Sequence, residues 1–436
     1  MFYISAEDEV AFALHELILG HGLGTLVVKP GQAVSESQWR GTASIAPVGF
    51  ASDEALLPET ERMFSGHRLL QEVATLPQRL LFFEINDLAA RLAATPGDEA
   101  ELVLLFSRFD AALETLVGTS SLSLHCTPAI NLFPKRLDRV LLGPGSADFH
   151  IVPDRTRPMD YEVHSIEQVV GHGASGTDSA RNFAPLNRST HRSLPDGDGY
   201  FSMRRTPRRA SERQRQQGAR VPSYLGDEVY VQLVDGRHGP HRDTLRQLSV
   251  QALVTNRDLP VLLPREGSGG RDAWQLDAAA PVTALTCLRG PSRPVARRAE
   301  GDLGWQLVAQ LTQQHLAPGD DPEQAAAALR ATLRLYGPPD ESWARQIDGV
   351  RSLAVSTVTR RLPFPGPLSF GSGVLIELEL DDTAFQGASA FLLASVLERF
   401  FARHAAINSF TQLTLKSVQR GPVKTWPARA GARPTA

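Results

Sequence analysis

Short apolar runs alternate with amphipathic stretches over the first 125 residues. The runs at 25–28 and 79–85 are rich in Val, Leu, Ile and Phe, which favour buried strands, and 101–109 and 121–126 predict further strands. The stretch 66–77 has the three-to-four spacing of an amphipathic helix. Residues 1–125 therefore predict an α/β domain.

The alternation of strands and helices begins at the first residues of the sequence. A strand at Phe2–Ile4 leads into a helix for which Ser5 and Asp8 predict a capping box and Gly20 predicts the end. The apolar positions of this helix are Val10, Leu14, Leu17 and Ile18. We expect no leader segment before it, and the chain looks as if it starts inside a larger design.

The pattern changes after residue 125. Runs of strand type occur at 160–171, 228–235, 248–255 and 283–288, and Pro and Gly punctuate them without a strong helical stretch. Residues 126–300 therefore predict a β-rich middle domain. Within it, residues 172–222 are rich in Gly, Ser, Asp and Arg, and this composition predicts one long loop.

Helical spacing returns at 301–336, where Asp302 is a candidate cap and Pro322 a candidate first-turn residue. Two strands, a long helix at 385–405 and a last strand follow. The helix has a wide apolar stripe that suits a sheet, and Glu398, Arg399 and Arg403 are expected to face outward. Residues 301–420 predict a C-terminal mixed α/β domain, and 421–436 predict a disordered tail.

The expected fold is thus α+β and multidomain. It comprises an N-terminal α/β unit, a β-rich middle domain and a C-terminal mixed α/β unit with one long amphipathic helix on a sheet.

Composition narrows the class of protein. The chain has 436 residues, 42% of them hydrophobic, and a net charge of −3, which does not favour bulk nucleic-acid binding. Two cysteines in so long a chain argue against a disulfide framework. With neither a signal peptide nor an apolar run long enough to span a bilayer, the sequence predicts a soluble cytoplasmic protein.

Motifs for chemistry are weak. The run GHGASG at 171–176 has the glycine spacing of a dinucleotide fingerprint, but no helical pattern follows it, so we expect a loop and no cofactor. The histidines and cysteines fit no zinc spacing, so no metal is expected. Glu377 and Glu379 share one face of a strand and are expected to be a solvated face rather than an acid–base pair. An enzyme would need distant residues such as Cys126 and His164 to converge.

The strongest charge feature is the segment 204–220, which holds seven arginines, one glutamate and no lysine. Three interpretations stay open: a solvated loop, a protein interface or a nucleic-acid contact. The third would need aromatic interleaving or a regular element, and only Tyr200 and Phe201 lie near.

Several stretches together resemble one known family. HCTPAINLFPKRLDRV around Cys126 resembles a C-x-P-x-x-N-L-F segment of the TssF family, also called VasA or ImpG. RLLQEVATLPQRLLFFEINDL, DYEVHSIEQVVG, SYLGDEVYVQLVD, LSVQALVTNRDLPVLLP and the C-terminal third resemble further segments of that family in the same order. The family's long helical N-terminal region has no counterpart here.

The resemblance implies a structural role without enzymatic activity. TssF is a subunit of the type VI secretion baseplate wedge, in which two TssF copies join one TssG around the VgrG spike hub. TssK, TssE and the tail sheath attach there, and the baseplate docks on the inner-membrane complex, which would be the chain's indirect link to a membrane. No cofactor and no nucleic acid are implied.

The interface of this chain is predicted in two places. One is the arginine segment, with Arg204, Arg205, Arg208 and Arg209. The other is the connector 126–138, with Asn131 and Phe133. Its prolines fix φ and stiffen it, Asn131 can form an Asx turn, and Ile130, Leu132 and Phe133 can hold it to a core.

Overall fold

The computed structural model describes residues 1–58, 65–95, 97–143, 146–173, 180–186, 199–209, 224–235, 239–240, 245–263, 274–295, 319, 321–361 and 370–432. It divides into two compact units. Unit 1 joins Met1–Pro128 to Arg298–Ala436, and unit 2 is Ala129–Arg297. The sequence had separated 1–125 from 301–420, whereas the structure packs these two parts together.

The first part of unit 1 has mixed helices and strands. Among its described residues, one sheet has the order β4-β5-β1-β7 and a second has the order β3-β2-β6. The elements in chain order are β1 (Phe2–Ile4), α1 (Asp8–His21), β2 (Gly22–Val28), β3 (Arg40–Gly41), β4 (Ile45–Val48), α2 (Ser65–Thr75), β5 (Phe82–Ile85), α3 (Leu88–Ala93), β6 (Glu101–Phe106), α4 (Ala111–Leu116) and β7 (Leu122–Ser123).

Helix α1 begins and ends differently from the prediction. Its N-cap is Glu7, which makes no side-chain capping bond. Ser5, the expected cap, donates its hydroxyl instead to the Ser120 carbonyl at 2.8 Å. The capping box of Ser5 and Asp8 is therefore wrong. The helix also continues through Gly20 to His21, and a Cβ at Gly20 would lie 3.2 Å from the Phe391 ring, so this glycine allows close packing rather than ending the helix.

The second part of unit 1 is a sheet with helices. The sheet has the order β17-β18-β19-β20, with β21 paired to β19. Strands β18 and β19 are parallel and are connected by α9. The elements are α7 (Pro322–Leu333), α8 (Glu341–Asp348), β17 (Val350–Arg361), β18 (Phe370–Leu380), α9 (Ala390–His404), β19 (Phe410–Ser417), β20 (Gly421–Thr425) and β21 (Arg429–Ala430).

Two expected helix caps in this region can be compared with the structure. Pro322 does occupy the first turn of α7, and the Asp321 carboxylate caps the helix by accepting from the Gln324 amide at 3.3 Å. The expected helix that follows Asp302 lies outside the described residues.

Helix α9 contains the expected stripe, but it starts later. Ser389 caps the amide of Leu392 at 3.0 Å, so the helix begins at Ala390 rather than at 385. Glu398 does not face outward as predicted. It is 2% exposed and ion-pairs with Arg399 at 2.9 Å and Arg429 at 2.6 Å.

The predicted disordered tail is wrong for residues 421–432. Strand β20 pairs with β19, and the Trp426 ring stacks on Phe391 with ring centroids 5.6 Å apart. Lys424 donates to the Leu19 carbonyl of α1. Packing of Trp426 and pairing with β19 order a segment whose Pro, Ala and Arg content had suggested disorder. Residues 433–436 lie outside the described residues.

One core joins the two parts of unit 1. Buried side chains of β1, α1, α2 and β5 pack with those of α7, β18, α9 and β19 in a single cluster, which includes Ile4, Phe83, Leu329 and Phe400. The C-terminal part of the chain thus completes the core that the N-terminal part begins.

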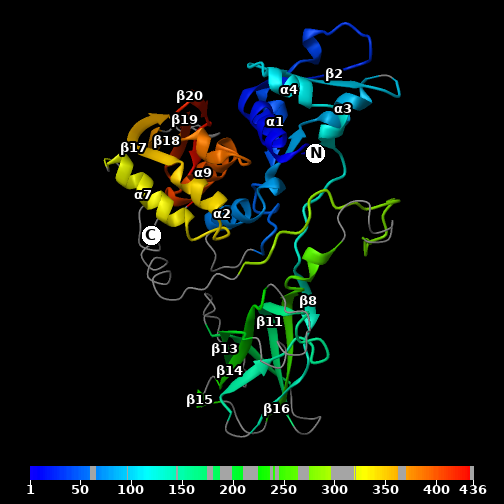
Figure 1. The fold of residues 1–436 in the computed structure, drawn as a ribbon, viewed down its shortest axis with the longest axis vertical. Coiled ribbons are helices and arrows are strands. Elements are labelled where there is room, and N and C mark those ends of the chain that lie inside the picture. The colour runs from blue at the N-terminus through cyan, green and yellow to red at the C-terminus, as the bar shows by residue number, and fades with distance from the viewer. Residues whose placement is uncertain are drawn as a thin grey trace. The chain divides into compact units, whose positions relative to one another are not determined.

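Unit 2 is built on strands that lie side by side (Figure 1), with the order β10-β14-β13-β12-β11-β16-β8 among its described residues. Strand β15 pairs with β14, and β9 pairs with β16. The strands are β8 (Phe133–Arg136), β9 (Val140–Leu141), β10 (Asp148–Ile151), β11 (Glu162–Gly173), β12 (Arg181–Pro185), β13 (Gly199–Pro207), β14 (Asp227–Asp235), β15 (Gly239–Pro240) and β16 (Leu245–Thr255).

Two strand predictions in unit 2 need correction. The segment 172–222 is not one loop, because β12 and β13 lie within it and pair in parallel, with Phe183 and Phe201 buried. Conversely, 283–288 forms no strand, since this run pairs with no other described strand and Leu288 is 40% exposed.

Short 3₁₀ turns complete the described chain. They are Glu36–Gln38, Thr42–Ser44, Pro77–Leu80, Thr119–Ser121, Leu259–Leu262 and Asp382–Phe385.

Candidate protein interface

The arginines that the sequence singled out begin on strand β13. Arg204 lies opposite Tyr230 of β14, which in turn lies opposite His150 of β10. The Arg204 guanidinium lies 4.9 Å from the centroid of the Tyr230 ring, and the His150 ring stacks on that tyrosine with centroids 4.8 Å apart. Three strands therefore present a continuous aromatic and basic row on one face of the sheet.

The row includes an acid that holds Arg204. The Asp148 carboxylate accepts from Arg204 at 2.7 Å and from the Gln232 amide at 2.6 Å. The hydrogen bond from Gln232, followed by that from Arg204, lowers the pKa of Asp148. The Arg204 side chain is still 47% exposed, so it can meet a partner while keeping this geometry.

Arg205 and Arg208 are committed to contacts within unit 2. Arg205 donates to the carbonyls of Val163, at 2.9 Å, and His164 on β11. The Arg208 side chain is 13% exposed, donates to the Pro158 carbonyl at 2.7 Å and lies 3.6 Å from the Glu228 carboxylate. These two side chains hold β13 to its neighbours.

Arg209 differs from the other three. It is exposed and makes no hydrogen bond or ion pair with another described residue. The rest of the arginine segment, residues 210–220, lies outside the described residues.

The connector residues are also used internally. The Asn131 side-chain oxygen accepts from the Asn256 amide at 3.2 Å, so the expected Asx turn on its own backbone is wrong. Phe133 packs against the core of unit 2 and meets Tyr161 edge-on, whereas Ile130 is 41% exposed. Pro134 is tolerated because β8 ends the sheet, where a missing amide donor costs little.

The distant-residue enzyme hypothesis gains no support from Cys126. Burial raises the pKa of this thiol, which disfavours the nucleophilic thiolate, and its sulfur contacts the Leu124 carbonyl at 3.5 Å. His164 has its pKa lowered by burial and then by the charge of Arg205. The glycine run that begins at Gly171 starts within strand β11 and not at the turn into a helix.

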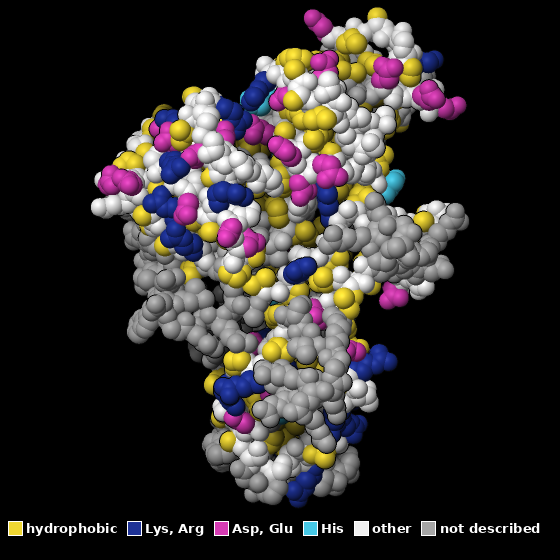
Figure 2. Space-filling model, in the orientation of Figure 1, with side chains coloured by type: hydrophobic (Ala, Val, Ile, Leu, Met, Phe, Trp, Pro, Cys, Tyr) yellow, Lys and Arg dark blue, Asp and Glu magenta, His cyan; other side chains and the backbone are white. Residues whose placement is uncertain are grey.

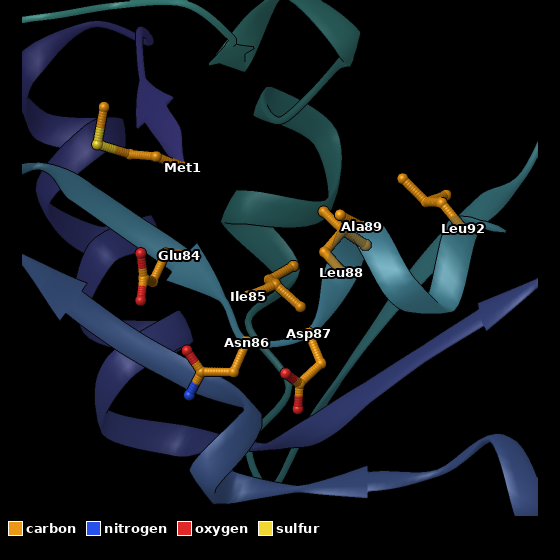
Figure 3. Close-up of a pocket in the computed structure, with 8 residues that line it drawn as sticks. All are labelled: Met1, Glu84, Ile85, Asn86, Asp87, Leu88, Ala89 and Leu92. Carbon is orange, nitrogen blue, oxygen red and sulfur yellow. The ribbon is translucent and has the colours of Figure 1, made fainter. Parts of the chain in front are cut away.

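A shallow hollow in unit 1 is lined by acidic and apolar side chains (Figure 3). It measures about 450 Å³ and is formed by the end of β5, by Met1 and by α3. Its carboxylates are those of Glu84 and Asp87, while Asn86 donates to the Ala43 carbonyl at 2.8 Å. The described residues include no group of three or more His, Cys, Asp or Glu side chains placed to hold a metal ion.

Sequence reasoning missed a buried ion cluster in unit 1 and a buried arginine in unit 2. In unit 1, Glu72 ion-pairs with Arg68, at 3.2 Å, and with Arg79, and all three side chains are buried. In unit 2, Arg257 is 4% exposed and donates to the carbonyls of Met159, at 3.2 Å, and Tyr224, at 2.7 Å. Only the i, i+4 spacing of Arg68 and Glu72 could have indicated either of them from the sequence.

None of the described helices has the length and apolarity needed to cross a membrane. The mixed helices and sheets of the described residues make this an α+β protein.

Comparison with known proteins gives the family. The family model described as "Type VI secretion system, TssF" matches residues 1–433, and the chain belongs to this family. It is 43% identical over 433 residues to "Type VI secretion system component TssF1" of Pseudomonas aeruginosa, covering 99% of this chain and 69% of that protein.

Two solved structures share the fold. One is a chain in the cryo-electron microscopy structure of the type VI secretion system TssK-TssF-TssG baseplate subcomplex, with a TM-score of 0.71 and 23% identity over 99% of this chain and 74% of that chain. The other is in the baseplate complex from the type VI secretion system, with a TM-score of 0.54 and 22% identity over 100% of this chain and 70% of that one.

Proposed function

We propose that this chain is a structural subunit of the type VI secretion baseplate and that it assembles with TssG and TssK. The observation that carries the proposal is the 43% identity to a TssF1 component across 99% of the chain. The shared fold with a chain of the TssK-TssF-TssG subcomplex supports it.

The finer parts of the proposal follow the family. A second TssF copy and one TssG would form the wedge, with TssE and VgrG as further neighbours. The chain would act in the cytoplasm, would reach the inner membrane only through the docking complex, and would catalyse no reaction.

Arg204 and Arg209 are the proposed contact residues, because both are exposed on or next to β13. Arg205, Arg208, Asn131 and Phe133 would support the same interface from within, since each holds a strand of unit 2 in place.

Mass measurement by light scattering tests the assembly. The chain is measured alone and after co-expression with TssG and then with TssG and TssK. A complex with two copies of this chain to one TssG is expected. A chain that remains monomeric and elutes apart from both proteins would contradict the proposal.

Charge reversal tests the contact residues. Arg209→Glu is expected to weaken recovery of TssG or TssK, while Arg334→Glu is a matched control on an exposed arginine of unit 1. Equal recovery with both variants would exclude Arg209 from the interface.

A further inference from the structure

Strand β6 forms one end of its sheet. It pairs with β2 and with no other described strand. The next amide, that of Ser107, also bonds on this side, to the His21 carbonyl at 2.9 Å. In an antiparallel pair alternate residues direct their N–H and C=O groups away from the partner. The outer side of β6 therefore has a row of backbone groups with no backbone partner among the described residues.

The sequence of β6 lacks the usual protection of an edge strand. Natural edges carry Lys, Pro or inward charges that block further pairing. Here five consecutive residues are apolar, from Leu102 to Phe106. Leu102, Leu104 and Phe106 pack against the core of unit 1, while Leu105 is 40% exposed on the opposite face.

Exposed apolar side chains also occur on β2 and in the segment that follows β6. Leu23, in the bulge of β2 beside β6, is 43% exposed. Phe109 and Leu116, just after β6 and at the end of α4, are 73% and 60% exposed. Figure 2 shows hydrophobic side chains gathered at the top of the view, over the region of α4 and β2. An added strand would partly cover the exposed Leu105 of β6, and water would leave it.

We propose that β6 pairs antiparallel with β6 of a second copy of this chain, across a two-fold axis. The proposal rests on the proposed function, in which two copies share one wedge, and it names the strand that would join them. The two three-stranded sheets, β3-β2-β6 in each copy, would then form one continuous sheet.

Charge favours a second copy in this orientation. Glu101 starts the apolar run and Arg108 follows it. Antiparallel pairing brings Glu101 of each copy to the end where Arg108 of the other lies, whereas parallel pairing would bring like charges together. With Leu104 on the axis, Val103 lies opposite Leu105 of the other copy, so the central cross-strand pairs are all apolar. The same patch serves both copies, as a two-fold interface requires.

Sedimentation velocity of the full chain tests the interface. Leu105→Lys and Leu105→Glu are each expected to abolish self-association, because like charges would meet near the axis. An equimolar mixture of the two variants is expected to recover the dimer, since the charges are then opposite. Ile407→Lys is the matched control, because Ile407 is 62% exposed and lies far from β6 in the sequence. A wild-type chain that stays monomeric, or charged variants that dimerise as well as wild type, would overturn the proposal.

Cysteine scanning gives a second readout that does not depend on the charged variants. A cysteine is placed at each position from 102 to 106 in turn, and the protein is treated with a mild oxidant. Only the residue on the axis faces itself, so one variant is expected to give a covalent dimer that Ile407→Cys does not. Absence of a covalent dimer at all five positions would equally overturn the proposal.

Failure of this inference and failure of the proposed function have different outcomes. If wild type binds TssG but never pairs through β6, the strand interface is wrong and the baseplate role stands. If wild type neither binds TssG nor self-associates, the proposed function itself fails. Retention of TssG by Leu105→Lys would separate strand pairing from TssG binding.

Discussion

The guanidinium of Arg420 ion-pairs with the carboxylate of Glu16, although 404 positions separate the two residues. The same guanidinium donates to Asp382 at 2.6 Å. The side chains of Arg420 and Glu16 are 30% and 15% exposed, so the contact is partly shielded from water. It fastens α1 to the turn between β19 and β20, and thereby joins the two ends of unit 1.

Loss of this contact is expected to destabilise unit 1. Arg420→Met removes two charge-assisted interactions and should lower the free energy of unfolding by about 2 kcal/mol. Urea denaturation followed by circular dichroism measures the change. Arg334→Met is the control, because its ion pair with Asp348 joins side chains that are 57% and 63% exposed. Surface pairs of this kind contribute about 0–1 kcal/mol, so equal losses in both variants would refute the role given to Arg420.

A larger effect is expected at Glu398 of α9. Glu398→Gln leaves Arg399 and Arg429 without their anion, and burial already lowers the pKa of Arg399 to about 10. Breaking a buried pair in this way typically costs about 3–5 kcal/mol. The midpoint of thermal unfolding should therefore fall clearly.

Glu377→Gln is the matched control for that prediction. Glu377 and Lys416 form an ion pair at 2.6 Å, with side chains 53% and 38% exposed. We expect little change in the unfolding midpoint. A similar loss in both variants would mean that the burial of Glu398 does not govern its contribution.

Stability should depend on pH through His15 of α1. Its side chain is fully buried, so an imidazolium at this position would lose its hydration. Burial lowers the pKa of His15 from 6.5 to about 4, so the unfolded chain takes up a proton that the folded chain refuses in this range. The free energy of unfolding should fall as the pH drops from 6.5 towards 4, by up to about 1.4 kcal/mol per pH unit.

His67 contributes to the pH dependence of the free energy of unfolding in the same pH range. Burial and then the charge of His404 lower its pKa to about 4. His15→Met is therefore expected to reduce the pH dependence without abolishing it. Denaturant unfolding at several pH values measures the slope. A slope unaffected by His15→Met would show that this histidine is not kept neutral by the fold.

The two arginines that follow β13 should separate into one structural and one exposed residue. Arg208→Ala removes a mostly buried side chain with its bond to the Pro158 carbonyl and should lower stability by about 1–3 kcal/mol. Arg209→Ala should change it by less than about 0.5 kcal/mol. Chemical denaturation of the two single variants checks this. Equal effects would mean that Arg208 does not fasten β13.

Local sequence patterns predicted the helices and strands of this fold better than they predicted the contacts between distant segments. Spacing alone predicts the apolar stripe of α9 and the strands β11, β14 and β16. The buried face of each element is determined by residues that are close together in the sequence. Glu398 was misplaced because its partner Arg429 lies in a tail whose composition suggested disorder. The two errors have one cause, an ion pair between segments that no local window contains.

The same reasoning explains the arginine segment. Arg204 and Arg205 looked like loop residues among Gly, Ser and Arg, yet their pairing with Tyr230 and Val229 of β14 makes them part of strand β13. Asn131 was assigned to its own turn because its partner, the Asn256 amide, lies on a distant segment. The family, in contrast, could be predicted, because the ordered set of motifs extends along nearly the whole chain.

The joining of Met1–Pro128 to Arg298–Ala436 has a consequence for synthesis on the ribosome. The first 128 residues emerge early, but their core lacks α9 and Trp426 until almost the entire chain has been translated. Unit 2 is continuous in sequence and can fold while the nascent chain is still growing. During that interval apolar side chains of residues 1–128 remain exposed to solvent. Chaperones that recognise nascent chains are therefore expected to bind mainly to this segment.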